Sequence, residues 1–260
     1  MAAFNISFVG AGNVAESLAR GLAAAGHRIV SVTSRNGENA RVLAAAAGAE
    51  WRHDLSVPAE CEVVIISVTD SAVAGVAASL VVPEGTVIAH TAGSVPLDAL
   101  GRKSGAGVFY PLQTFTKGFP PDLKKVPFFI EATDSRTLQI LRELGESIGT
   151  GVWECDSVAR KQLHVAAVFT NNFSNYMMTV GDSVAASAGI DAKLLRPLME
   201  ETVRKALRTG PEAAQTGPAV RHDTGTMESH IDLLSFSPQY QKLYRLVSKM
   251  ISGHYRKGKK

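Results

Sequence analysis

NISFVGAGNVA, residues 5–15, is the stretch of the sequence that decides the fold. Its first half is an apolar run typical of a strand, its second half is a glycine-rich turn, and residues 16–25 are typical of a helix. A strand, a G-x-G-x-x-A turn and a helix in this order are the context in which the glycine pattern indicates a dinucleotide site. Gly10 permits the tight turn, Gly12 lets the backbone approach a pyrophosphate, and Ala15 is small enough for the helix to pack on the strand. We therefore predict dinucleotide binding here; the alternative is a glycine turn without a ligand.

The end of the second predicted strand, residues 27–33, indicates which dinucleotide binds. In sites that prefer NAD an acidic residue at this point holds the ribose 2′-hydroxyl, whereas this chain has hydroxyl groups and an arginine. A guanidinium suits a 2′-phosphate, so we expect NADP. Ligands of open α/β sheets lie outside the carboxyl ends of the strands. The residues at the end of the strand predicted at 62–67 are therefore also expected beside the cofactor. The predicted cofactor-binding residues are Gly10, Ala11, Gly12, Asn13, Val14, Ser34, Arg35, Ser67, Val68 and Thr69.

Composition excludes several classes of protein. With 45% hydrophobic and 20% charged residues and a net charge of +3, the chain is ordinary globular material. Part of the charge is the basic tail 256–260, which we interpret as a solvated, frayed end because no aromatic residues interleave a wider basic patch; we expect no nucleic-acid partner. The two cysteines are far apart in the sequence, which favours reduced thiols over a disulfide framework or a metal cluster. Without a signal peptide or a spanning segment, we expect a cytoplasmic protein with no membrane partner.

Strand and helix patterns alternate as far as about residue 154, and only helices are expected after it. This alternation predicts a doubly wound, mostly parallel sheet, followed by an all-α domain. The connection from 111 to 125 is rich in Pro, Gly and Lys and is long for a compact α/β unit, which is typical of a functional loop. We expect the strand at 86–90 to end in the same ligand crevice, with residues 90–94 beside it.

Polar residues mark one side of a long helix predicted over 156–187. Lys161, His164, Asn171 and Asn172 fall on that side of a 3.6-residue wheel, and apolar residues cover most of the rest, so we expect a buried helix. Buried polar groups need partners, which are either a substrate and the nicotinamide amide, or neighbouring helices and a second subunit.

The stretch 216–230 carries the densest set of functional side chains in the sequence. A Gly-Pro turn precedes Arg221, His222 and Asp223, and Pro218 is placed to open a short helix that faces an anion. The alternative is a capped loop that Arg221 and Asp223 tie down. The histidines lack a third ligand at a zinc-like spacing, so we expect no metal.

Taken together, the motifs resemble those of Rossmann-like proteins with a DUF2520 C-terminal domain. This group is related to pyrroline-5-carboxylate reductase, the F420-dependent NADP reductases and the 6-phosphogluconate and 3-hydroxyacid dehydrogenases. The third motif of the group usually begins with His, where this chain has Tyr110. The matching stretches are Phe8–Ala15, His90–Ser94, Tyr110–Phe115, the helix with Lys161, His164 and Asn171, and Thr216–Asp223.

The resemblance implies an NADP-binding Rossmann domain over 1–154 and a helical, DUF2520-like domain over 155–260. It also implies a substrate cleft between the domains and a homodimer formed through the C-terminal helices. The lysine-to-asparagine spacing of the hydroxyacid dehydrogenases is not reproduced at Lys161, so their mechanism is not carried over residue by residue.

Our first hypothesis is an NADP-dependent oxidoreductase that moves hydride between the nicotinamide and a small carbonyl or imine. His164 is the expected proton donor because histidine titrates near neutral pH, with Lys161 second. Alternatives are a non-catalytic NADP-binding dimer and an enzyme whose hydride partner is the deazaflavin F420. The predicted catalytic residues are His164, Lys161 and Asn171, and the predicted substrate-binding residues are Thr91, Gly93, Ser94, Gln113, Asn172, Arg221 and Asp223.

Overall fold

The structure, a computed structural model, describes residues 3–256. The chain divides after Asn171 into two compact units, which we call the N-terminal unit and the C-terminal unit and describe separately. The last four residues of the basic tail, 257–260, lie outside the described residues. Within residues 3–256 no helix is both long and apolar enough to cross a bilayer.

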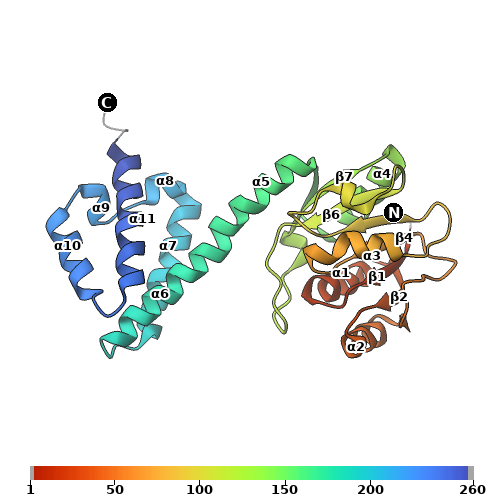
Figure 1. The fold of residues 1–260 in the computed structure, drawn as a ribbon, viewed down its shortest axis with the longest axis horizontal. Coiled ribbons are helices and arrows are strands. Elements are labelled where there is room, and N and C mark those ends of the chain that lie inside the picture. Colours follow the sequence, from red (N-terminus) through yellow and green to blue (C-terminus); the bar gives the residue numbers. More distant parts are fainter. Residues whose placement is uncertain (1–2, 257–260) are drawn as a thin grey trace. The chain divides into compact units, whose positions relative to one another are not determined.

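The N-terminal unit contains an eight-stranded sheet in the order β3-β2-β1-β4-β5-β6-β7-β8. Figure 1 shows strands of this sheet together with helices of the same unit. Neighbouring strands are parallel except β6 and β7, which are antiparallel. The structure thus confirms the predicted doubly wound, mostly parallel sheet. The strands are β1 (Asn5–Val9), β2 (Arg28–Thr33), β3 (Glu50–Arg52), β4 (Val63–Ile66), β5 (Val87–His90), β6 (Ala106–Pro111), β7 (Pro127–Ala132) and β8 (Gly151–Glu154).

Both faces of this sheet are covered because successive side chains of its buried strands point to opposite sides. Ile6 and Phe8 of β1 belong to the core formed with α1, α2 and α4, whereas Val9 belongs to the core formed with α3. The two cores together cover both faces of the sheet. The helices are α1 (Asn13–Ala24), α2 (Gly37–Ala47), α3 (Val73–Ser79), α4 (Ser135–Ile148) and α5 (Ser157–Ala167), with short 3-10 turns η1 (Asp70–Ala72), η2 (Leu97–Leu100) and η3 (Leu123–Lys125).

The sheet fixes where a ligand can bind. β1 pairs with β2 on one side and with β4 on the other, so the strand order reverses at β1. At such a reversal the connections leave in opposite directions and open a crevice beyond the carboxyl ends of the strands. The turn between β1 and α1 lies at this point.

The C-terminal unit is helical. A π-helix, η4 (Val168–Phe173), joins α5 to α6, so the helix predicted over 156–187 is not regular throughout. Pro218 does open a short helix, and His222 adopts a left-handed φ of 57° after it. The elements of this unit are α6 (Ser174–Ser187), η5 (Ala192–Leu195), α7 (Arg196–Thr209), α8 (Pro211–Ala214), α9 (Pro218–Arg221), α10 (Thr224–Leu233) and α11 (Pro238–Arg256).

The prediction that the helical run 156–187 is buried is wrong for the single chain. Val165, Tyr176 and Met177 are each 40% or more exposed. On α5, Arg160 is the one buried residue that the structure describes. An isolated chain therefore leaves much of this apolar surface in water.

Candidate functional site

The turn after β1 has the conformation that the glycine pattern predicts. Gly10 has φ +111°, and a Cβ atom there would lie 2.1 Å from the carbonyl oxygen of Ser67. Both facts require glycine, because other residues rarely adopt this φ and the turn lies directly against the end of β4. A Cβ atom at Gly12 would meet nothing within 4 Å among the described residues, so a ligand has room there.

The start of α1 suits a phosphate group. Gly12 occupies the N-cap position and has no side chain with which to satisfy the first N–H groups of the helix. These N–H groups, together with the positive end of the helix dipole, favour an anion. The open space at Gly12 and the uncapped helix end therefore fit the pyrophosphate of a dinucleotide.

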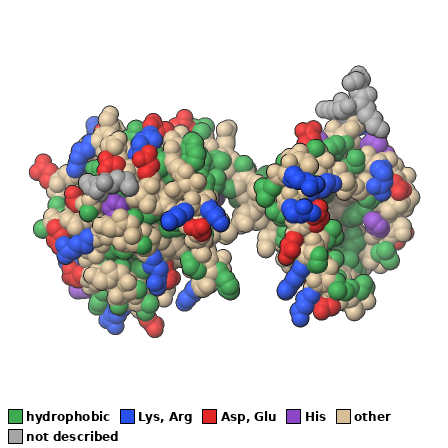
Figure 2. All heavy atoms as spheres, turned by 180° about the vertical axis from the view of Figure 1, so that it is seen from behind, with side chains coloured by type: hydrophobic (Ala, Val, Ile, Leu, Met, Phe, Trp, Pro, Cys, Tyr) green, Lys and Arg blue, Asp and Glu red, His purple; other side chains and the backbone are tan. Residues whose placement is uncertain are grey.

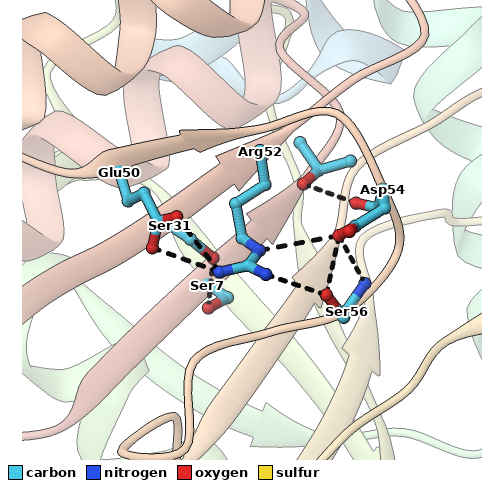
Figure 3. Close-up of polar contacts among 7 residues, drawn as sticks. Ser7, Ser31, Glu50, Arg52, Asp54 and Ser56 are labelled. Carbon is cyan, nitrogen blue, oxygen red and sulfur yellow. Dashed lines mark hydrogen bonds and ion pairs between the residues drawn. The ribbon is translucent and has the colours of Figure 1, made fainter.

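A cluster around Arg52 engages the carboxylates near the end of β2 (Figure 3). The Arg52 guanidinium donates to Glu50 and to Ser56, and its Nε lies 3.6 Å from Asp54. Asp54 accepts from the Ser56 hydroxyl and backbone N–H, and these hydrogen bonds lower the pKa of Asp54. Thr33 donates to the Asp54 carbonyl oxygen at 3.0 Å. Both carboxylates are thus engaged by neighbouring side chains of this cluster.

Ser34 and Arg35 follow β2 directly, and Arg35 is exposed. Arg35 makes no ion pair with any carboxylate in residues 3–256. An uncommitted guanidinium next to a hydroxyl is a fitting partner for a 2′-phosphate.

Hydroxyl groups from neighbouring strand ends meet in the crevice. Thr91, after β5, donates to the Ser67 hydroxyl, after β4, at 3.3 Å. Ser94 donates to the Asp70 carboxylate in a short hydrogen bond. Thr91 and Ser94, two of the predicted substrate-binding residues, thus lie near the carboxyl ends of β4 and β5. The glycine turn follows the neighbouring strand β1. Val68 packs against the core beside α3, and Thr69 precedes η1.

Tyr110 and His164 form a hydrogen-bonded pair beside the loop that follows β5. Tyr110 is a buried residue of β6, and its hydroxyl lies 3.1 Å from Nδ1 of the half-buried His164 on α5. Burial raises the pKa of Tyr110, which keeps the phenol protonated. Gly93 lies against both side chains, because a Cβ atom there would be 2.7 Å from His164 Nδ1 and 2.8 Å from Tyr110 Cζ. Contacts therefore lead from the glycine turn through Ser67 and the loop after β5 to this pair.

Arg160 fixes α5, and with it His164 one turn later. Its guanidinium is 1% exposed, forms an ion pair with Glu131 on β7, and donates to the Val95 carbonyl oxygen at 2.6 Å. Ser157, at the start of α5, donates to Glu131 at 2.7 Å and accepts from the Leu97 N–H at 2.9 Å. These bonds join α5 to β7 and to the loop after β5.

His90, the first residue of the predicted crevice loop, is a buried structural residue. Its Nδ1 accepts from the Ala92 N–H at 3.2 Å, so a neutral ring carries its proton on Nε2. Burial, with the nearby charge of Arg160, lowers the pKa of His90 to about 4. His90 is therefore neutral near pH 7 and does not donate a proton as an imidazolium.

Acid is expected to destabilise the fold through His90. Because its folded pKa of about 4 lies below the unfolded value of about 6.5, the neutral ring contributes stability above pH 6.5 that is lost as the pH falls. We expect the free energy of unfolding to fall by about 2 kcal/mol between about pH 7 and about pH 5, measured by urea denaturation. Burial of His27 acts in the same direction. His90→Asn should flatten this pH dependence, and an unchanged slope would contradict the assignment.

The other predicted residues are not partners in the Tyr110–His164 hydrogen bond. Lys161 and Asn171 are exposed, and the Gln113 side chain accepts from the N–H of the next residue at 2.8 Å. Asn172, Arg221 and Asp223 belong to the C-terminal unit. Asp223 caps α10 by accepting from the N–H and the hydroxyl of Thr226, which lowers the Asp223 pKa. The roles assigned to these residues stay predictions.

Sequence reasoning missed Tyr110 and Arg160. Tyr110 begins the stretch that carries the third motif, and the signal was its replacement of the usual histidine. Arg160 lies one turn before His164, a spacing that places both on one side of a helix. In the described part of the chain no group of three or more His, Cys, Asp or Glu side chains is arranged to hold a metal ion.

Comparisons with known proteins find two family matches in this chain. Residues 126–251 match the family described as a domain of unknown function, DUF2520, and residues 5–93 match the family described as NADP oxidoreductase, coenzyme F420-dependent. The chain is 37% identical to a candidate NADP oxidoreductase from Bacteroides fragilis, with 96% of this chain and 98% of that chain covered and a TM-score of 0.86. A comparison with curated proteins finds no match.

Two more distant structures share the fold. Protein TM1727 from Thermotoga maritima is 23% identical, with 98% of this chain and 100% of that chain covered and a TM-score of 0.76. A reductive aminase from Aspergillus terreus, solved in complex with NADPH and ethyl-5-oxohexanoate, is 15% identical, with 99% and 95% covered and a TM-score of 0.66.

Proposed function

We infer the function from the family: this chain belongs to the NADP oxidoreductases that carry a DUF2520 domain, and it is homologous to NADP-dependent enzymes. We propose that it transfers hydride between NADP and a small carbonyl or imine substrate. The observation that carries the proposal is the Tyr110–His164 pair, at the strand ends that also hold the glycine turn.

The chain's own residues supply cofactor binding and a proton. NADPH, when bound, supplies the hydride. The N–H groups at the start of α1 would hold its pyrophosphate, and Ser34 and Arg35 its 2′-phosphate. Reduction of a carbonyl or imine leaves an oxygen or nitrogen atom that must gain a proton, and His164 would donate it. The Tyr110 hydroxyl holds Nδ1 of His164, which orients the ring and leaves Nε2 as the donor.

Binding and turnover test this proposal separately. NADPH and NADH are titrated against the protein by intrinsic fluorescence, and we expect NADPH to bind at least about tenfold more tightly because of the 2′-phosphate contacts. NADPH oxidation is then followed with a panel of small keto acids and cyclic imines. An imine is the first class to screen, because reductive amination is the chemistry named for one protein of the same fold. Equal affinity for NADH would contradict the cofactor assignment, and NADPH binding without oxidation would favour a non-catalytic module.

F420 is a second candidate for the hydride partner. The observation that favours it is the description of the family that matches residues 5–93. Reduced F420 is mixed with NADP and the absorbance of the deazaflavin is followed. Oxidation of F420 that is faster than any imine or keto acid reduction would make the deazaflavin the substrate.

We also propose that two copies associate through their C-terminal units. Leu194, Leu198 and Leu207 along η5 and α7 are 64–84% exposed, and apolar side chains are visible on this unit in Figure 2. An open hollow of 520 Å³ in the same unit is lined almost wholly by apolar side chains. Exposed apolar surface of this extent is typical of subunit interfaces, and a second copy carries the same surface to cover it.

Leu207→Glu is expected to convert the dimer to a monomer, because it places a charge in the proposed interface. Light scattering coupled to size-exclusion chromatography should give about half the wild-type mass. Val81→Glu is the control, since Val81 is 67% exposed in the N-terminal unit. A wild-type monomer, or an unchanged mass for Leu207→Glu, would contradict the proposal.

A further inference from the structure

We propose that Lys117 binds a phosphate group of the dinucleotide. Lys117 is a cation in the loop between β6 and β7, and this loop lies beside the glycine turn. The inference rests on the proposed cofactor site and adds to it a residue more than 80 positions from its motifs at Gly10 and Arg35. Lys117 lies in the long connection that follows Pro111.

The loop lies along α1 at two points. The Asn13 side chain, at the start of α1, donates to the Phe115 carbonyl oxygen at 3.0 Å. Farther along the helix, Leu123 fills the space beside Gly21, where a Cβ atom would lie 2.3 Å from Leu123 Cδ1. Asn13, predicted as a cofactor residue, thus holds the loop against the glycine turn.

Lys117 lies in a tight turn. Thr116 and Phe119 pair as an isolated antiparallel bridge, with the Phe119 N–H donating to the Thr116 carbonyl oxygen at 3.1 Å. Gly118 has φ +81°, which suits the second central position of a type II turn. Lys117 is therefore the first central residue, at the tip of the turn, and it is exposed.

Lys117 and the glycine turn line the same hollow. The hollow has a volume of about 110 Å³ and includes Gly12 from the turn and Asn13, Glu16 and Arg20 from α1. Arg20 is already paired with Glu16, with 3.1 Å between the charged atoms. Lys117 makes no ion pair with any carboxylate in the described residues, so it is the uncommitted cation of this hollow.

The charge balance of the cofactor site favours this role. The turn and the start of α1 offer N–H groups and a partial positive charge, whereas a dinucleotide pyrophosphate carries two full negative charges. An ammonium group acts as a point charge and needs no bidentate geometry, so a mobile lysine at a turn tip is sufficient. Because the group is exposed, its contribution should weaken as salt is added.

Lys117→Gln tests the inference by binding rather than by turnover. NADPH and NADH are titrated against the full-length protein at low salt, and we expect the dissociation constant to rise about fivefold to tenfold. An equal rise for both dinucleotides identifies the pyrophosphate as the group bound, and a rise for NADPH alone identifies the 2′-phosphate. Lys117→Arg should retain most of the affinity, and high salt should reduce the difference between wild type and Lys117→Gln.

Lys125→Gln is the matched control, because Lys125 is in the same connection but lies 3.7 Å from Asp122. An unchanged dissociation constant for Lys117→Gln, or an equal loss in Lys125→Gln, would overturn the inference and leave the proposed function in place. Failure of the wild-type protein to bind NADPH would instead contradict the proposed function, and with it this inference. The thermal unfolding midpoints of the variants are compared to verify that each is folded.

Discussion

Arg160→Met is expected to lower the free energy of unfolding by about 3 to 5 kcal/mol. The Arg160 side chain is 1% exposed and its partner Glu131 is 18% exposed, so the substitution leaves a carboxylate without its counter-charge in a largely dry site. The Val95 carbonyl oxygen also loses a donor. Urea denaturation at neutral pH, with linear extrapolation, measures the difference.

Arg142→Met is the matched control for this prediction. Arg142 also pairs with a glutamate, Glu154, but the two side chains are 30% and 57% exposed, so we expect a change below about 1 kcal/mol. The double variant Arg160→Met with Glu131→Leu should recover part of the loss, because no unpaired charge remains. Equal losses for Arg160→Met and Arg142→Met would show that burial of the first pair has no energetic consequence.

His164→Ala is expected to lower kcat for reduction of the substrate found by screening by about 100-fold or more, because the proton donor is lost. The dissociation constant for NADPH should stay close to that of the wild type, since the imidazole of His164 is hydrogen-bonded to Tyr110 and to no residue of the glycine turn in the described part of the chain. Tyr110→Phe, which removes the hydroxyl that orients the imidazole, should cost less and should shift the pH profile of kcat. Stopped-flow measurement of NADPH oxidation separates the chemical step from product release.

Two further variants decide between donors. Lys161→Ala removes the second predicted donor, which is exposed on the same helix, and His254→Ala removes an exposed histidine of α11. We expect both to retain most of the turnover. A larger loss in Lys161→Ala than in His164→Ala would make the lysine the donor.

The N-terminal half of the fold follows from local patterns. The run at 5–9, the glycine turn and the buried stretch at 62–67 each indicate their element directly, because their signals lie within a few neighbouring residues. The doubly wound, mostly parallel sheet also follows, since strands and helices alternate along this half of the chain. The predicted strand at 107–110 has the same apolar pattern as its parallel neighbours, although its partner β7 runs antiparallel. Direction is set by the connection and not by the strand itself.

The site could be predicted only in part, because its contacts join distant segments. Tyr110 and His164 are 54 residues apart, and Arg160 and Glu131 are 29 apart. Burial of an arginine depends on a partner that no local pattern reveals. The π-helix at 168–173 has a different reason: it adds residues to a turn, so a 3.6-residue wheel does not relate Asn172 to His164.

The antiparallel pair β6 and β7 determines which part of the chain can vary in length between related proteins. Pro111 lies opposite Phe128, and the Leu112 N–H donates to the Pro127 carbonyl oxygen at 3.0 Å, so the connection is closed at its base. Doubling the length of a closed loop costs only about 0.6 kcal/mol. We therefore expect insertions, deletions and charge changes between residues 113 and 122 to leave the register of the sheet intact. For the same reason we expect homologues to differ in this segment more than in the strands on either side of it.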